Sequence, residues 1–249
     1  MSTSIISKLN KRKSITSPDK ELLEMMSFAK KMYTQTDKIF NIQLGGIMED
    51  IGYDADLSFR SKKTNQRHAK TFGVCSNSNE LTILPYTKLD IGGFGKGWLI
   101  DNIARLIRNA GPKFFSINAG GDIYTTSDSS TPVSVLLENP FDTTQPIGCI
   151  NLTSKALAAS SPNRRRWKSP TDRKTYHHLL DRHGKNKRTM AAVFVVHPLA
   201  KIADAGATAL SSAKLSEIKE ISKTLCIQYL IVMPDGRYFK SHDFELQPD

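Results

Sequence analysis

The sequence predicts an α+β fold built largely from antiparallel sheets with flanking helices. Many short apolar runs follow one another and are separated by turn residues, which is typical of hairpin-connected strands. Only a few segments have a helical period, and they interrupt the strands instead of alternating with them. The 249 residues are enough for a sizeable core, and no linker divides them. We therefore expect a single domain over residues 1–249.

The first third of the chain is expected to contain one helix, one hairpin and two loops. The helix follows Pro18 and Asp19, and its apolar residues repeat with a helical period. In chain order, the predicted elements are the helix 21–33, a mixed loop and turn region 36–53, an exposed basic loop 60–70, and strands 72–75 and 81–84 around the polar turn 77–79.

A glycine-rich junction comes next. A strand at 88–91 is expected to run into Gly92, Gly93, Gly95 and Gly97, and then into a helix that ends near Gly111. Glycines let the backbone approach a ligand closely, and the N–H groups at a helix start favour an anion. The spacing matches neither the P-loop nor the dinucleotide-binding fingerprint. A tight strand-to-helix turn without a ligand is the alternative.

The second half is expected to be mostly strands, with two further helices. The first of these helices opens at His197-Pro198 and is made of small residues. In chain order, the predicted elements are a buried strand 114–117, a turn 118–122, strands 133–137, 147–152, 156–159, 177–180 and 190–196, the small-residue helix, a helix 216–225, a strand 228–233, and a final hairpin through the turn 234–236 to 237–240.

Asp204 and Thr208 lie four residues apart on the small-residue helix, so they share one face. A carboxylate and a hydroxyl among Ala and Gly suit a hard cation such as Mg²⁺, with room left for phosphate oxygens. Two structural roles without a metal are the alternatives. Asp204 can complement the helix dipole while Thr208 bonds the preceding turn, and the small residues can serve close helix packing.

The charge of +11 is unevenly spread, because the basic segment 164–188 holds ten Lys and Arg against two Asp. It either steers an anionic ligand or acidic partner, or is a solvated loop. No nucleic-acid-binding motif is visible, so no specific nucleic acid is expected. No window approaches a membrane span, no signal peptide is visible, and three scattered cysteines favour a reducing compartment. We therefore expect a cytoplasmic protein.

Several motifs, in order, resemble those of the ApbE family of FAD:protein FMN transferases. The family's LDLGGIAKGYAVD is similar to residues 89–101, its NAGGDI to 118–123, its HILDP-type segment to 178–181 and its ADALATAL to 203–210. Its SRLN and TDGAF stretches resemble residues 6–10 and 36–40. The resemblance covers nearly the whole chain and implies a T-fold-related ApbE domain.

The resemblance also implies a reaction, in which FMN passes from FAD to a threonine hydroxyl of an acceptor flavoprotein and AMP leaves. Mg²⁺ would be bound by Asp204 and Thr208, with carbonyls near Gly95 and Ala207. His178 would be the base that deprotonates the threonine, although a strand histidine is more often structural. The FAD-binding residues implied by the resemblance are Ile39, Phe40, Asn41, Gly92, Lys96, Trp98 and Leu179.

The chain departs from the family pattern at several points. The family's opening strand is absent, so the domain is expected to be N-terminally short, and no lipobox is present. Asn41 replaces an acidic residue, Gly206 replaces a leucine, and the DPRTG loop is shortened to residues 181–184. Two alternatives keep the same site: an FAD pyrophosphatase that gives FMN and AMP, and a non-catalytic flavin or nucleotide binder. A basic nucleic-acid binder is a further alternative.

Overall fold

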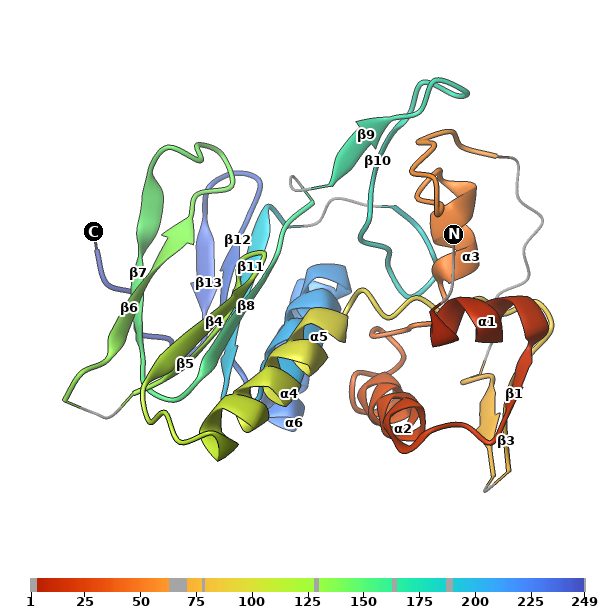
Figure 1. The fold of residues 1–249 in the computed structure, drawn as a ribbon. Helices are drawn as coiled ribbons and strands as arrows, with labels where there is room; N and C mark the ends of the chain where they lie inside the picture. Colours follow the sequence, from red (N-terminus) through yellow and green to blue (C-terminus); the bar gives the residue numbers. More distant parts are fainter. Residues whose placement is uncertain are drawn as a thin grey trace. The chain divides into compact units, whose positions relative to one another are not determined.

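The computed structural model describes residues 4–62, 71–77, 79–127, 130–162, 165–186 and 190–248. The structure combines helices with antiparallel sheets (Figure 1), so the predicted α+β class is confirmed. The chain forms two compact units, residues 1–91 with 166–186 and residues 92–165 with 187–249. Most of the predicted basic loop 60–70 lies outside the described residues, as do Ser78, Arg164, Lys187 and Arg188.

The first unit contains three helices and two small antiparallel sheets among its described residues. Strand β3 lies between β1 and β2, and β9 pairs with β10 in a separate hairpin. The elements are α1 (Ile5–Arg12), β1 (Ser14–Thr16), α2 (Lys20–Gln35), α3 (Gly45–Asp50), β2 (Val74–Ser76), β3 (Glu80–Ile83), β9 (Arg166–Lys168) and β10 (Thr175–His177).

Helix α2 is the helix predicted after Pro18 and Asp19. The Asp19 carboxylate accepts the Leu22 amide at 2.7 Å, which caps the helix start. Helix α1 had no counterpart in the prediction. Helix α3 forms where a loop was predicted, so that prediction was wrong. A Cβ on Gly45 would lie 3.0 Å from the Lys88 carbonyl, so this glycine allows close packing that outweighs its weak helix propensity.

The strand predicted at 88–91 does not form. A single parallel bridge joins Lys88 to Leu44, with the Gly45 N–H donating to the Lys88 carbonyl at 3.1 Å and the Asp90 N–H to the Ile42 carbonyl at 2.7 Å. The side chain of Asn10 binds the segment at Leu89. The Asn10 amide donates to the Leu89 carbonyl at 2.8 Å and its oxygen accepts the Leu89 N–H at 2.7 Å. The Asn10 side chain thereby satisfies both backbone groups of Leu89, which a further strand would have paired.

The second unit is a six-stranded antiparallel sheet with a hairpin and three helices in its described part. The strand order is β13-β12-β11-β8-β5-β4, and β6 pairs with β7. The elements are α4 (Gly95–Asn109), β4 (Phe115–Ala119), β5 (Asp122–Thr126), β6 (Val133–Glu138), β7 (Pro146–Leu152), β8 (Ala156–Ser160), β11 (Ala192–His197), α5 (Ala200–Ser212), α6 (Leu215–Leu225), β12 (Gln228–Val232) and β13 (Tyr238–Lys240).

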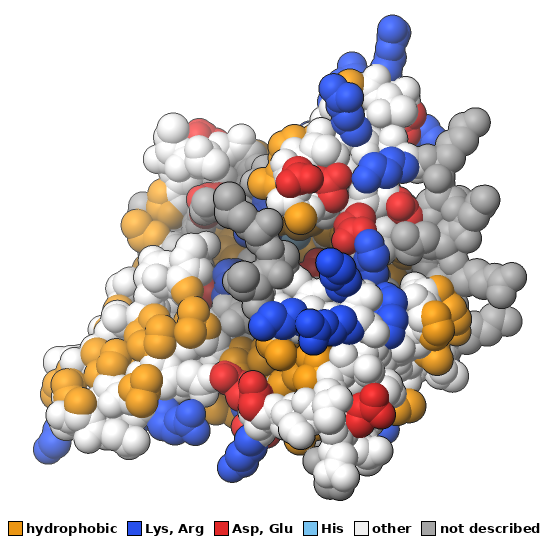
Figure 2. All heavy atoms as spheres, turned by 45° about the vertical axis from the view of Figure 1, so that its right-hand side comes forward, with side chains coloured by type: hydrophobic (Ala, Val, Ile, Leu, Met, Phe, Trp, Pro, Cys, Tyr) orange, Lys and Arg blue, Asp and Glu red, His pale blue; other side chains and the backbone are white. Residues whose placement is uncertain are grey.

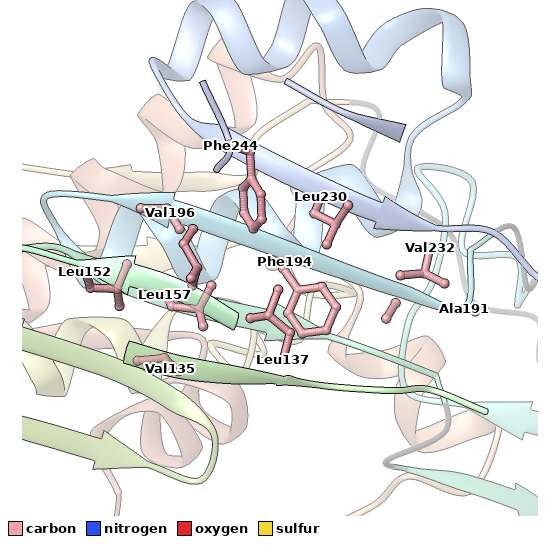
Figure 3. Packing of buried hydrophobic residues seen from close by; sticks show 12 residues of the cluster. Val135, Leu137, Leu152, Leu157, Ala191, Phe194, Val196, Leu230, Val232 and Phe244 are labelled. Carbon is pink, nitrogen blue, oxygen red and sulfur yellow. The ribbon is translucent and has the colours of Figure 1, made fainter. Parts of the chain in front are cut away.

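The core of this unit lies between the β6–β7 hairpin and one face of the large sheet (Figure 3). Phe194 and Val196 of β11 face the hairpin, with Leu137 from β6 and Phe244 from the C-terminal segment among the side chains that pack there. Because side chains alternate along a strand, Val195 faces the other way, onto helix α5. Burial on both faces explains why the strand predicted over 190–196 is almost wholly apolar.

Strand β4 is an edge strand with alternating partial exposure, so the prediction of a buried strand there was wrong. Its position at the edge has a consequence for the site. The tight hairpin that follows returns the chain directly into β5, and β5 pairs with β8 in the interior of the sheet. The first residue of β5, Asp122, is therefore buried.

Candidate functional site

Helix α5 packs closely against helix α4 at the start of both helices. A Cβ on Gly97 would lie 2.3 Å from the carbonyl oxygen of Ala200, so only glycine fits at this crossing. Gly206, which replaces a leucine of the family pattern, has the Ile227 and Val195 side chains within 3.1 and 3.4 Å of such a Cβ. The small residues of α5 thus serve close packing, which brings α5 side chains to the glycine loop.

Asp204 lies on α5 with its carboxylate directed at the first turn of α4. The side chain is 3% exposed, and one oxygen accepts the Gly97 N–H at 3.0 Å. The other oxygen lies 3.1 Å from the Lys96 ammonium. Two residues of the glycine motif therefore contact a residue more than one hundred positions later in the chain. A carboxylate at a helix start is favoured by the free amides there.

Asp122 completes this cluster, and no sequence pattern assigned it to the site. Its carboxylate lies 2.7 Å from the Lys96 ammonium and is 4% exposed. Its second oxygen accepts the Ala159 N–H from strand β8 at 3.2 Å. Gly120 and Gly121, with φ of 67° and 101°, form the two-residue turn that places it. The available signal was the aspartate that ends the NAGGD motif directly after such a turn.

The electrostatics of the cluster follow from one ammonium shared by two buried carboxylates. Burial raises the pKa of Asp122 to about 6, with the Asp204 carboxylate contributing to the rise and the Lys96 ammonium opposing it. Burial works against the charge of Lys96, but Asp204 and Asp122 together raise its pKa. Lys96 therefore stays charged, and the cluster has unbalanced negative charge when both carboxylates are ionised.

Thr208 lies one turn after Asp204, and its hydroxyl donates to the carbonyl oxygen of Gly93 at 3.2 Å. Gly95 lies midway in the chain between Gly93 and Gly97, which both contact α5 side chains, and Ala207 directly precedes Thr208 in α5. The atoms near Asp204 and Thr208 that could serve as metal ligands are oxygens, and they lie beside excess negative charge. Both properties fit a hard cation. Among the described residues, no three His, Cys, Asp or Glu side chains form a metal-binding group. A cation would therefore need hydroxyl, carbonyl or phosphate oxygens as well.

Asp101 fixes the start of α5 from the neighbouring helix. Its carboxylate accepts the N–H groups of Ala200 and Lys201 at 2.8 and 3.1 Å. Leu199, which precedes the helix, provides no side-chain cap of its own. Burial raises the pKa of Asp101, and the two amide bonds oppose the rise. This aspartate of the family-like motif is thus a cap for the helix that carries Asp204.

Trp98 and Gly92 lie on either side of the helix start. Trp98 is buried, stacks edge-on against Phe94 at 6.1 Å between ring centroids, and has the Lys201 ammonium 4.7 Å from its ring centre. Gly92 is exposed on the loop before α4. The flavin-binding roles implied for Trp98 and Gly92 stay predictions.

His178 belongs to the first unit and lies directly after strand β10. Its neighbour His177 is buried, and the His177 ring nitrogen Nδ1 accepts the Leu179 N–H at 3.3 Å. His178 is half-buried, with its ring centroid 6.5 Å from that of Tyr53. The two adjacent histidines thus differ in surroundings: His177 has the structural role that a strand histidine usually has, and His178 is the more accessible one.

An aromatic cluster supports the β9–β10 hairpin next to His178. Trp167 stacks on Tyr53 and Tyr176 with centroid distances of 5.7 and 6.3 Å, and Phe59 lies 5.5 Å away. The Trp167 indole N–H donates to the Ile51 carbonyl at 3.0 Å. The hairpin is therefore anchored on residues 51–59, while Figure 2 shows Lys and Arg side chains gathered on its outer part.

The remaining flavin-binding residues implied by the family also lie in the first unit. Ile39 and Phe40 are buried, and their N–H groups donate to the backbone carbonyl and side-chain hydroxyl of Thr36. Leu179 is buried too, and its carbonyl accepts the Asn186 amide at 3.1 Å. Asn41 is half-buried and its side-chain oxygen accepts the Gln43 N–H at 2.9 Å. The amides of Ile39 and Phe40 are therefore already used within the chain.

The shortened loop after Leu180 is a closed turn. The Asp181 carboxylate accepts the N–H groups of His183 and Lys185, both at 2.8 Å. Gly184 has φ of 69°, which a glycine adopts without strain. Leu180 packs on Ile47 and Met48 of α3. The segment that carries His178 is therefore ordered on both sides despite the deletion.

Fold and site together define an α+β protein in which a glycine loop, a lysine and two buried aspartates form a charged cluster at the meeting of two helices. The family model described as "ApbE family" matches residues 1–231. The chain belongs to the ApbE family.

Two curated proteins named FAD:protein FMN transferase are similar to this chain. The one from Rhodobacter capsulatus is 23% identical over 231 residues, which are 89% of this chain and 44% of that protein. The one from Salmonella typhimurium is 20% identical over 236 residues, which are 88% of this chain and 67% of that protein. The chain thus spans less than half the length of the first relative and about two thirds of the second.

Solved structures share the fold. The ApbE protein of Thermotoga maritima superimposes with a TM-score of 0.84 at 21% identity, covering 96% of this chain and 82% of the other. The flavinyl transferase ApbE of Pseudomonas stutzeri, in its apo form, gives a TM-score of 0.78 at 16% identity over 97% and 80% of the two chains. At these identities the likeness establishes the fold. Within the described residues, no helix is long and apolar enough to cross a membrane.

Proposed function

We propose that this protein transfers FMN from FAD to a threonine hydroxyl of an acceptor flavoprotein, with Mg²⁺ as cofactor and AMP as the leaving group. The observation that supports it most is the cluster of Asp204, Lys96 and the Gly97 amide at the start of α4. A carboxylate suited to a cation and an ammonium suited to a phosphate lie together there, at a helix start that favours an anion. Family membership and the curated relatives named FAD:protein FMN transferase support the same reaction.

Asp204 and Thr208 are the side chains we assign to Mg²⁺, with carbonyls of Gly95 and Ala207 completing the protein's share of the ligands. Mg²⁺ held there would supply positive charge that neutralises the diphosphate and the leaving group. The exposed loop at Gly92 and the first amides of α4 would hold phosphate oxygens. Lys96 adds a positive charge whose raised pKa keeps it protonated. These residues bind and orient the diphosphate.

His178 is the residue we assign to proton transfer. Its Nδ1 lies buried, which leaves Nε2 as the nitrogen for the acceptor hydroxyl. The threonine oxygen forms a bond to the FMN-side phosphorus while the bond to the bridging oxygen breaks. AMP leaves with the bonding electrons, and the hydroxyl proton passes to His178. An imidazole has the pKa class that such a transfer needs near neutral pH.

The test is to incubate the protein with FAD, Mg²⁺ and a threonine-containing acceptor, with EDTA as the control, and to weigh the products. The proposal requires an acceptor heavier by FMN, together with AMP, only when Mg²⁺ is present. Free FMN and AMP with an unmodified acceptor would instead support the pyrophosphatase. Binding of FAD with no product would support the non-catalytic binder.

A further inference from the structure

Lys96 occupies the oxygen of Asp204 that a bound cation would need. Its ammonium lies 3.1 Å from that carboxylate and 2.7 Å from Asp122, and both carboxylates are almost fully buried. The other Asp204 oxygen already accepts the Gly97 N–H. A divalent cation beside Asp204 would meet an ammonium in the same place, and two cations at one carboxylate repel each other.

Asp122 is placed to hold the ammonium when this happens. Its Ala159 hydrogen bond fixes one oxygen to strand β8, so the oxygen facing Lys96 is held by the sheet and not by a loop. Lys96 itself is 39% exposed, and its unbranched chain can tilt between the two carboxylates. The shorter of its two contacts is already the one to Asp122.

We propose that Asp122 is a positioning residue that acts through Lys96. It retains the ammonium when a divalent cation takes Asp204, and so lowers the cost of displacing Lys96 from that carboxylate. The ammonium then stays beside the diphosphate as a second positive charge. This inference rests on the proposed function only in placing the cation at Asp204.

The test is calorimetric titration of Mn²⁺ into the metal-free protein without FAD, in four forms: the parent, Asp122→Asn, Lys96→Met and the double variant. Asparagine keeps an oxygen for the Ala159 N–H, so the sheet contact survives. Asp122→Asn should weaken Mn²⁺ binding by about tenfold or more, the size of one charge-assisted hydrogen bond. Lys96→Met should strengthen it, because no ammonium competes for Asp204.

The double variant separates positioning from a direct effect of the Asp122 charge. If Asp122 acts through Lys96, then Asp122→Asn in the Lys96→Met background should change the Mn²⁺ affinity by less than about threefold, as expected when the interacting partner has already been removed. An equal loss in both backgrounds would overturn the inference, since Asp122 would then act on the cation without Lys96. Weaker Mn²⁺ binding by Lys96→Met than by the parent would also overturn the inference. This comparison can be made even if the Asp122 variants do not fold.

The same titration distinguishes a failure of the positioning role of Asp122 from a failure of the cation site at Asp204. A parent protein that binds no Mn²⁺ contradicts both the metal site and the role of Asp122. A second outcome is that the parent binds Mn²⁺, Asp204→Asn does not, and Asp122→Asn binds it with the affinity of the parent. This outcome supports the metal site and contradicts only the positioning role.

Discussion

The carboxylate of Asp204 accepts the amide hydrogen of Gly97 at 3.0 Å. This contact joins two motifs that are far apart in the chain, and it ties the helix with the expected metal ligand to the first turn after the glycine loop. A tight turn alone would explain the glycines, and dipole complementation would explain the aspartate. Their contact shows that Asp204 complements the dipole of α4, not that of its own helix.

Asp204→Asn should abolish the Mg²⁺ dependence of FAD binding while the protein stays folded, because an amide oxygen can still accept the Gly97 N–H. Asp204→Ala is the harsher variant. It leaves that buried amide without its acceptor, at a cost of about 1–3 kcal/mol in the free energy of unfolding. Flavin fluorescence titrations with Mg²⁺ and with EDTA, beside urea unfolding, separate the two effects. Mg²⁺-dependent binding that survives Asp204→Asn would contradict the metal role.

Gly97→Ala should destabilise the second unit, because its Cβ would meet the Ala200 carbonyl at 2.3 Å and force α4 from α5. We expect a loss of about 1–3 kcal/mol from overpacking, partly offset by the better helix propensity of alanine. Gly206→Ala is the matched control, since its nearest contact, at 3.1 Å, is the end of the Ile227 side chain. Equal unfolding midpoints for the two variants would show that the helix crossing does not depend on Gly97.

The contribution of Asp122 to the stability of the metal-free protein should fall as pH rises from about 4 to 6. The pKa of Asp122 is raised from 3.8 to about 6 in the folded state, so the folded protein binds a proton there that the unfolded chain has released. This difference in pKa changes the free energy of unfolding by at most about 3 kcal/mol, because one pKa unit corresponds to about 1.4 kcal/mol. Urea unfolding in EDTA across this range should give a flatter profile for Asp122→Asn than for the parent. Identical profiles would contradict the raised pKa.

Neutralising Arg166 and Lys168 on the β9–β10 hairpin should slow association with an acceptor, most strongly at low salt. Both side chains are exposed, and within the described residues neither forms an ion pair. Stopped-flow association rates over a range of ionic strengths measure the steering effect. Lys20→Gln is a control at another exposed lysine, with a side chain 90% exposed. Equal rates at every salt concentration would favour the solvated-loop interpretation.

Much of the fold could be predicted from local patterns, and the errors have physical causes. Helix α2 and most strands of the second unit followed from periodicity and turn residues, but β5, which begins at Asp122, was not predicted. Helix α3 did not follow from these patterns, because Gly45 and Gly46 have poor helix propensity, and Gly45 packs on the distant backbone of Lys88 and Leu89. The segment 88–91 has a strand-like sequence, but it forms only one bridge, to Leu44, and the Asn10 side chain binds the backbone of Leu89. No local pattern contains these contacts.

The candidate site was predictable as two motifs but not as a cluster. The spacing of Asp204 and Thr208 and the glycine loop were each visible in the sequence. The role of Asp122 depends on a hairpin that turns it into the sheet interior, where burial and Lys96 define its chemistry. The difference between His177 and His178 was also invisible, because it depends on which ring the fold encloses.

The most direct test of the account is the rate of FMN attachment to an acceptor threonine by the parent and by His178→Ala, followed by mass spectrometry. We predict that the parent gives acceptor carrying FMN together with AMP, and that His178→Ala is slower by about 10²–10⁴, the usual cost of losing a general base. FAD binding with Mg²⁺ should be largely unchanged in the variant. His177→Ala, by contrast, should mainly lower stability, because it removes the buried acceptor of the Leu179 amide. A parent that never modifies the threonine, or a His178→Ala variant that modifies it at the parent rate, would contradict the account.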